Sequence, residues 1–304
     1  MKDTVTINEK ELIAREKLNN PSFARTIWRE IIHDKMAIIS LILLIIILGT
    51  AYLSPLFIDQ VALKRVNFLN VWKPPSAANW LGTDDGGRDV FGQLMIGARN
   101  SFTIGIAVTV IAGVIGLSYG LISGFYGGHV DNVMMRFLEF MMVLPTTMFI
   151  IVMVTIIPNY NVVSFILIMS VFLWLGKARL IRSRALQERE LDYINASKTL
   201  GTPSWKIMLF EMFPNLSSLV IVNMTLTLAG NIGIETGLTF LGYGLPAGTP
   251  SLGTLVAFAR NPDIVQNKWW SWLPAALLIL VMMLCINFVG QAIKRASDAR
   301  QRLA

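Results

Sequence analysis

Five long stretches of the 304-residue chain carry no formal charge and are dense in aliphatic side chains. A membrane-spanning helix needs about 20 such residues. One stretch, from Phe140 to Gly176, is too long for a single helix and contains the turn-forming cluster Pro158-Asn159-Tyr160-Asn161. The pattern therefore predicts six membrane-spanning helices, near residues 36–57, 101–124, 134–157, 162–180, 216–238 and 271–293.

The first 35 residues are polar, but they include an amphipathic pattern. Asn20-Pro21 is a good helix start, and Phe23, Ile27 and Ile31 then recur every four residues. The spacing predicts a helix on the cytoplasmic surface of the bilayer. The alternative is a simple extension of the first span.

Composition agrees with a membrane protein, because 54% of the residues are hydrophobic and only 15% are charged. We expect a cytoplasmic segment at 1–35, one membrane domain at 36–293 and a cytoplasmic tail at 294–304. The net charge of +7 does not indicate a nucleic-acid partner, since no basic run alternates with aromatic residues. The single cysteine, Cys285, excludes a disulfide within the chain.

The distribution of Lys and Arg predicts the orientation. With a cytoplasmic N-terminus, the inside segments 1–35, 124–140, 176–215 and 294–304 hold 19 of the 26 basic residues. Cytoplasmic loops carry an excess of Lys and Arg. We therefore expect a multi-pass protein of the cell membrane with both termini in the cytoplasm.

The second predicted span has a stripe of small residues. Gly116, Gly120 and Gly124 are four residues apart and allow another helix to approach closely. The partner helix belongs either to this chain or to a second subunit, and the sequence leaves both possibilities open.

The segment 188–215, between the fourth and fifth spans, is predicted to form a cytoplasmic helical hairpin. Gly201 can end one helix, and Thr202-Pro203 can start another. An apolar edge with helical spacing follows, and an exposed edge of this kind usually binds a partner. Its residues are Trp205, Met208, Leu209 and Met212, followed by Pro214.

Few other side chains suggest a site. Asp84, Arg88 and Asp89 lie among glycines in an external loop, where a structural turn is favoured over substrate contact. Glu235 lies in an apolar run near the outer end of the fifth span, and it either faces the transport pathway or reaches water. Arg136 and Glu139 are spaced for a local ion pair. The two histidines are far apart in sequence, so we predict neither a metal site nor catalytic residues.

The order Asn195-Ala196-Ser197, three residues, Gly201, nine residues and Glu211-Met212-Phe213-Pro214 resembles a known motif. It is similar to the coupling motif of ABC importer permeases, written EAA, three residues, G, nine residues, I-x-L-P. Ala196, Gly201 and Pro214 match. Asn195 replaces the motif's carboxylate.

Further blocks resemble the oligopeptide, dipeptide and nickel branch of these permeases, and in particular its C-type peptide permease subunit. They are Leu81 to Asp89, Gly97 to Ser101, Gly124 to Gly128, Asp131 with Arg136, and Leu238 to Gly244.

This resemblance implies an all-α, type I ABC importer fold and several partners. These are a second homologous permease subunit, two ABC ATPase subunits that bind ATP and Mg, an extracytoplasmic peptide-binding protein and the lipid bilayer. The segment Asn195 to Pro214 would couple the permease to the ATPases. The chain has no phosphate-binding loop. Its only Gly-Lys pair, Gly176-Lys177, has Val171 where such a loop needs its first glycine and Ala178 where it needs Ser or Thr. We therefore expect no cofactor on this chain and no enzymatic activity of its own.

Other functions remain to be compared. The same scaffold can carry nickel or another small solute instead of peptides. A secondary transporter or channel would show internal repeats or mid-span charged relays. A membrane-embedded enzyme would need paired catalytic groups at depth, and the spans offer almost none.

Overall fold

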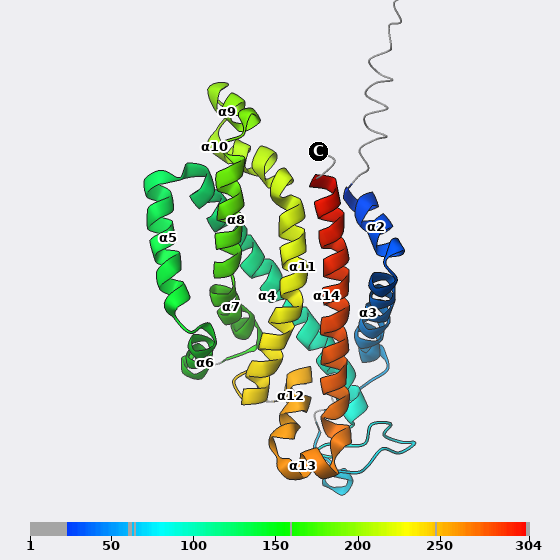
Figure 1. Cartoon of the computed structure of the whole chain (residues 1–304). Coiled ribbons are helices and arrows are strands. Elements are labelled where there is room, and N and C mark those ends of the chain that lie inside the picture. The colour runs from blue at the N-terminus through cyan, green and yellow to red at the C-terminus, as the bar shows by residue number, and fades with distance from the viewer. Residues whose placement is uncertain (1–22, 60–62, 64, 159, 247, 302–304) are drawn as a thin grey trace, which may run out of the picture.

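The computed structural model describes residues 23–301, except 60–62, 64, 159 and 247, and these residues are almost entirely helical. Within this part of the chain there is no strand, only an isolated bridge between Thr83 and Asp89. The helices stand side by side, while α4 crosses behind them (Figure 1). Their bounds are α2 Phe23–His33, α3 Lys35–Leu53, α4 Val90–Tyr126, α5 Gly128–Val143, α6 Thr146–Ile156, α7 Val162–Leu173, α8 Leu175–Glu188, α9 Asp192–Thr199, α10 Ser204–Lys206, α11 Phe213–Leu241, α12 Leu252–Val256, α13 Pro262–Asn267 and α14 Leu273–Gln301.

Four continuous helices are long and apolar enough to cross a membrane: 35–56, 90–126, 204–241 and 273–297. Two helix pairs also meet this criterion, but each is bent: α5 with α6 by 79°, and α7 with α8 by 43°. The described residues therefore contain four to six candidate spans, and the predicted count of six holds only if each bent pair is one span.

The single helix expected at 134–157 is wrong. Leu144 has an extended backbone, with ψ at 130°, and separates α5 from α6. The cause is Pro145, because proline disfavours the helical conformation at the residue before it. The prediction of one helix at 162–180 is also wrong, since α7 ends at Leu173. At that bend the Lys177 ammonium group donates to the Leu173 carbonyl at 3.3 Å.

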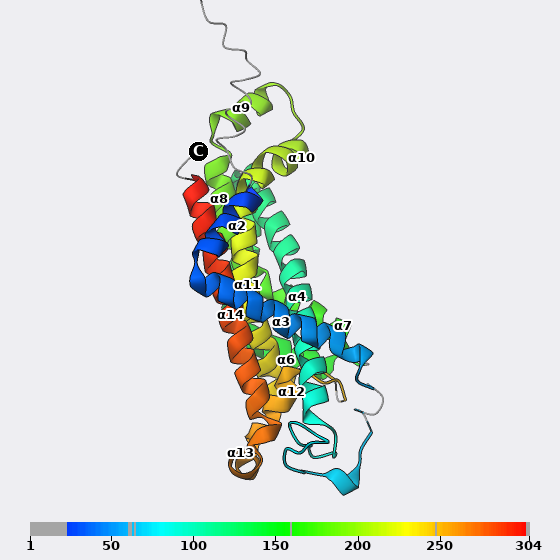
Figure 2. The ribbon, with the colours of Figure 1, turned by 90° about the vertical axis from the view of Figure 1, so that its right-hand side faces the viewer.

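The two ends of the molecule are built from different segments. Helices α2, α9 and α10 lie at the same end as the C-terminus, whereas α12, α13 and the loop before α4 lie at the opposite end (Figures 1 and 2). The elements predicted to be cytoplasmic thus lie at one end, and those predicted to be external lie at the other. The predicted external segment 238–271 is more ordered than expected, because it contains α12, α13 and two short 3-10 turns.

The glycine stripe of α4 packs against α8 of the same chain. A Cβ atom added at Gly116 would lie 2.8 Å from Lys177 Cβ, and one at Gly120 would lie 2.7 Å from the Ala178 carbonyl oxygen. At Gly124 the added atom would be 2.5 Å from Ala185 Cβ. Of the two possibilities left open by the sequence, the structure shows packing within the chain.

Charged groups join α4, α5 and α8 near the same end as α9. The guanidinium group of Arg182 donates to both carboxylate oxygens of Asp131, each at 2.5 Å, and Ser123 also donates to Asp131. Arg136 instead pairs with Glu139 at 3.3 Å, as its spacing predicted. The bonds to Asp131 hold α5 against α4 and α8.

The N-terminal amphipathic helix is present as α2, although its predicted start at Asn20-Pro21 lies outside the described residues. Its Ile27 and Ile31 pack with Ala292 of α14. Arg295 of α14 pairs with Glu30 at 3.4 Å and also with Asp34. The side of α2 that carries Ile27 and Ile31 thus packs on the chain's own last helix, whereas Trp28 and Ile32 are exposed.

Candidate coupling segment and outer sites

The segment between α8 and α11 contains two helices separated by Gly201. Gly201 has φ at +78°, and its N–H donates to the Lys198 carbonyl at 3.0 Å. The next N–H, from Thr202, donates to the Ser197 carbonyl at 3.1 Å. This pair of bonds is the Schellman ending that glycine favours. The following helix begins one residue later than predicted, with Pro203 at the cap position rather than inside the helix.

The predicted hairpin has a second helix that is separate from the fifth span. In the structure, the helix that begins at Ser204 is not separate. It continues through a π turn, Ile207–Met212, directly into α11. Pro214 explains the turn, because proline has no N–H and its ring clashes with the carbonyl four residues earlier. In the π turn the Phe213 N–H bonds to the Met208 carbonyl, five residues back, and the helix accommodates the proline.

Part of the predicted apolar edge is exposed. Trp205 is 54% exposed, and Phe210, which the sequence analysis did not select, is 69% exposed. Met208 is half-buried. Met212 is fully buried against the interior cluster around Ile207 and Leu216, so its expected place on the exposed edge is wrong. Regular α-helical spacing predicts Met212 on the same face as Trp205, but the π turn that ends at Met212 departs from that spacing.

Two further apolar side chains of this segment are exposed. Leu200 is 85% exposed at the end of α9, and Leu209 is also exposed. Helical periodicity could not identify Leu200, because it is the C-cap residue that follows α9 and lies outside the helix. We call Leu200, Trp205, Leu209 and Phe210 the coupling patch.

The three residues at the start of the motif lie on α9. Asn195 and Ala196 are exposed, whereas Ser197 is half-buried. The Asn195 amide donates to the Glu190 carbonyl at 3.2 Å. At this position the chain therefore makes a local bond to backbone, and no ion pair.

Three polar side chains tie α9 to the neighbouring spans. The Tyr193 hydroxyl donates to the Glu188 carboxylate, and the Asn215 amide donates to Glu188 at 3.0 Å and to the Tyr193 oxygen at 2.7 Å. Burial raises the pKa of Tyr193 to about 12, and the bond to Glu188 adds to the shift. Tyr193 therefore stays protonated at neutral pH and joins the ends of α8, α9 and α11.

At the opposite end, Asp84 organises the outer loop. Its fully buried carboxylate accepts bonds from the backbone N–H groups of Gly86 at 2.9 Å and Arg88 at 2.8 Å. It also accepts bonds from the Arg88 guanidinium group and the Gln93 amide, both at 2.8 Å. Asp89 caps α4 by accepting the Gly92 N–H at 2.7 Å. All three predicted loop residues thus have structural bonds.

Glu235 lies in α11 and has no exposed surface. Its carboxyl group accepts a bond from Thr239 at 3.0 Å, and hydroxyl groups surround the rest of it. It therefore does not face an open pathway in this structure. In the described part of the chain, no group of three or more His, Cys, Asp or Glu side chains is arranged to hold a metal ion.

Comparison with known proteins identifies the class. Residues 116–303 match the family model described as the binding-protein-dependent transport system inner membrane component. The chain belongs to this family, and it is a membrane component of a transport system rather than an enzyme. Residues 22–75 match the N-terminal TM domain of oligopeptide transport permease C.

More particular similarities are to peptide permeases. The chain is 49% identical over 284 residues to the oligopeptide transport system permease protein OppC of Lactococcus lactis subsp. cremoris, covering 93% of this chain and 97% of that protein. It is 33% identical over 291 residues to OppC of Bacillus subtilis, with 94% and 93% covered. It is 32% identical over 298 residues to the dipeptide transport system permease protein DppC of the same organism, with 97% and 92% covered.

Proposed function

We propose that this chain forms half of the translocation pathway of an ATP-driven importer of oligopeptides or dipeptides. Its relatives are named as oligopeptide and dipeptide transport permeases. The observation that carries the mechanism is the coupling patch, an exposed apolar surface on short helices at the end of the molecule that also holds the C-terminus (Figure 1). An exposed apolar patch is typical of a protein interface.

The proposed assembly has five further components. A second, homologous permease subunit completes the pathway, and two ABC ATPase subunits bind ATP and Mg. A peptide-binding protein docks at the outer end, and the lipid bilayer surrounds the spans. The ATPases provide the hydrolysis, and their closure moves the coupling segment and the helices joined to it.

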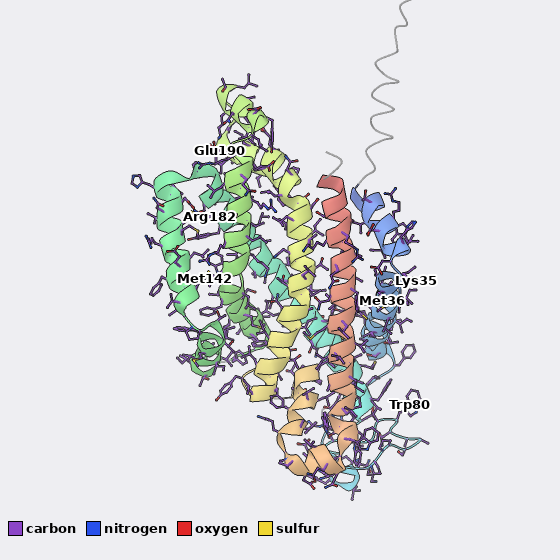
Figure 3. The ribbon with its side chains drawn as sticks, in the orientation of Figure 1. Lys35, Met36, Trp80, Met142, Arg182 and Glu190 are labelled. Atoms are coloured by element: carbon purple, nitrogen blue, oxygen red, sulfur yellow. The ribbon has the colours of Figure 1, made fainter. Side chains whose placement is uncertain are left out.

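The proposed topology has six spans, in which each bent pair crosses the membrane once. Both termini and the segment 188–215 are then cytoplasmic, because the basic residues are concentrated there. The loop around Asp84 and the segment with α12 and α13 are external. Trp80 lies in this outer loop, far from Glu190 near the coupling segment (Figure 3).

The coupling patch provides a matched test. Trp205 is 54% exposed on the coupling helix, and Trp80 is 69% exposed at the opposite end. Buried Trp residues at interfaces commonly contribute more than about 2 kcal/mol. We expect Trp205→Ala to reduce recovery of ATPase subunits in a pull-down of the tagged chain, whereas Trp80→Ala leaves recovery unchanged.

The substrate is tested by reconstituting the recovered complex, with its binding protein, into proteoliposomes. The expected result is ATP-dependent uptake of a labelled oligopeptide. Uptake of a nickel chelate without peptide uptake would reassign the substrate, and a verified chain that recovers no ATPase would contradict the importer itself.

A further inference from the structure

Glu235 is a buried carboxyl group held by hydroxyl groups from three parts of the fold. Thr239 donates to one carboxyl oxygen at 3.0 Å, and Thr236 lies 3.4 Å from the other. The hydroxyl groups of Ser101, in α4, and Ser251, which caps α12, also interact with the Glu235 carboxyl group. An uncompensated carboxyl group at this depth would be costly. Here its polar partners come from the fold itself.

The two serine hydroxyls have a definite polarity. Ser101 Oγ accepts the Leu252 N–H at 3.2 Å, and Ser251 Oγ accepts the Thr254 N–H at 3.1 Å. Each hydroxyl has one proton to donate. With backbone N–H groups already donating to them, their own protons are available for Glu235. The two serines thus link the Glu235 carboxyl group to backbone N–H groups in the first turn of α12.

The backbone packing around Glu235 is also close. A Cβ atom added at Gly97 would lie 2.8 Å from the Ser251 carbonyl carbon, and one at Gly253 would lie 2.6 Å from Thr239 Cβ. The Asn100 amide donates to the Pro250 carbonyl at 2.8 Å. The start of α12 is therefore seated directly on both α4 and α11.

We infer that Glu235 is a positioning residue that clamps the outer segment 250–260 onto α4 and α11. This inference rests on the proposed function, because it gives the clamp its role: motion that enters α11 from the coupling segment reaches the outer face where the binding protein docks. Glu235 is not a substrate contact, since it is fully enclosed and its oxygens face hydroxyl groups.

The inference is tested in the complete transporter with its binding protein, using Glu235→Ala, Glu235→Gln and the control Glu139→Ala. Glu139 is a half-exposed carboxylate on α5, away from the clamp. Two quantities are measured: hydrogen–deuterium exchange of the peptide containing Leu252 and Thr254, and the stimulation of ATP hydrolysis by the peptide-loaded binding protein.

With Glu235→Ala we expect exchange in α12 to accelerate about tenfold, because the hydroxyl groups lose their shared acceptor. Stimulation by the binding protein should fall at least about fivefold, while basal ATP hydrolysis is unchanged. Glu235→Gln retains the side-chain shape and one of the two acceptor oxygens, so it should lie between wild type and Glu235→Ala in both measurements. The Glu139→Ala control should also match wild type.

Unchanged exchange and stimulation in Glu235→Ala would overturn the clamp. A loss of uptake in Glu235→Gln limited to peptides with a free amino terminus, without faster exchange, would overturn it in favour of a substrate contact. If Glu235→Ala does not assemble, Thr239→Val removes one bond to Glu235 and leaves the Ser251 cap of α12 in place. It should show a smaller increase in exchange, and no increase contradicts the inference. Hydrogen–deuterium exchange is measured without transport. If Glu235→Ala accelerates exchange in a complex that does not import peptides, the clamp is supported and the proposed function alone fails.

Discussion

At Gly201 the backbone turns sharply enough to separate the two helices of the coupling segment. Its φ of +78° is unfavourable for residues with a Cβ atom, yet nothing lies within 4 Å of the place where that atom would be. The requirement for glycine is therefore one of backbone conformation and not of space. A substitution at Gly201 therefore tests the backbone conformation without causing a steric clash.

Gly201→Val should weaken the coupling segment specifically. A β-branched residue in the left-handed region costs roughly 1–2 kcal/mol, and relief of that strain would tilt α9 against the next helix. We expect normal membrane abundance, reduced ATPase recovery and reduced peptide uptake. Gly201→Asn is the matched variant, because asparagine tolerates this conformation better, and it should restore most of the recovery. Wild-type recovery and uptake in the valine variant would show that this turn is not part of the coupling element.

Individual residues also show how far sequence reasoning reaches. Asp84 among glycines predicts a structural turn, and the four bonds to its carboxylate fit that interpretation. Met212 does not lie where its spacing indicated, because a π turn changes the helical period and no period-based argument anticipates it. The surroundings of Glu235 come from Ser101 and Ser251, which are 150 residues apart. A linear pattern does not bring them together.

Among the helices, the interface of α4 with α8 depends on the absence of side chains on one face. An added methyl group at Gly120 would meet the Ala178 carbonyl oxygen at 2.7 Å, and a backbone atom cannot move aside easily. Gly230 is a helical glycine with nothing within 4 Å of its added Cβ position. The two positions therefore form a matched pair.

Gly120→Ala should destabilise the purified protein by about 1–3 kcal/mol through overpacking. Gly230→Ala should be neutral or slightly stabilising, because alanine favours helix over glycine by about 0.5–1 kcal/mol. Thermal unfolding of both variants in the same detergent measures the difference. An equal unfolding temperature for the two would contradict the assignment of the stripe to packing within the chain.

The apolar stretches predicted where helices occur, but not how they bend. An apolar run has the same composition in a straight span and in a bent pair, so the sequence predicts one helix at 162–180 and does not show the bend between α7 and α8. The proline at 145 is a stronger signal, and it marks the break between α5 and α6. Helices α12 and α13 were missed because they are five and six residues long, too short for a periodic pattern to be distinctive.

For the molecule as a whole, the predicted orientation can be measured at two exposed sites. Leu200 is 85% exposed in the coupling segment, and Phe68 is 83% exposed in the outer loop. Cys285 is the single cysteine of the chain, so Cys285→Ala provides a background without thiols. Single Leu200→Cys and Phe68→Cys variants then report on the two ends.

A membrane-impermeant maleimide should label Phe68→Cys in intact cells, and Leu200→Cys only in inverted vesicles from cells that lack the ATPase subunits. This follows from the concentration of Lys and Arg on the side of Leu200. The opposite pattern would reverse the topology, and labelling of both sites in intact cells would place them on the same side.

The continuous helix from Ser204 to Leu241 has 38 residues and carries the coupling patch at one end and the surroundings of Glu235 near the other. At 1.5 Å per residue it is about 55 Å long, which makes it a lever arm. Pivoting such an arm by about 10° about one end displaces its tip by about 10 Å, close to the diameter of a helix. A small rotation near the pivot therefore produces, at the far end, a movement about as wide as a helix.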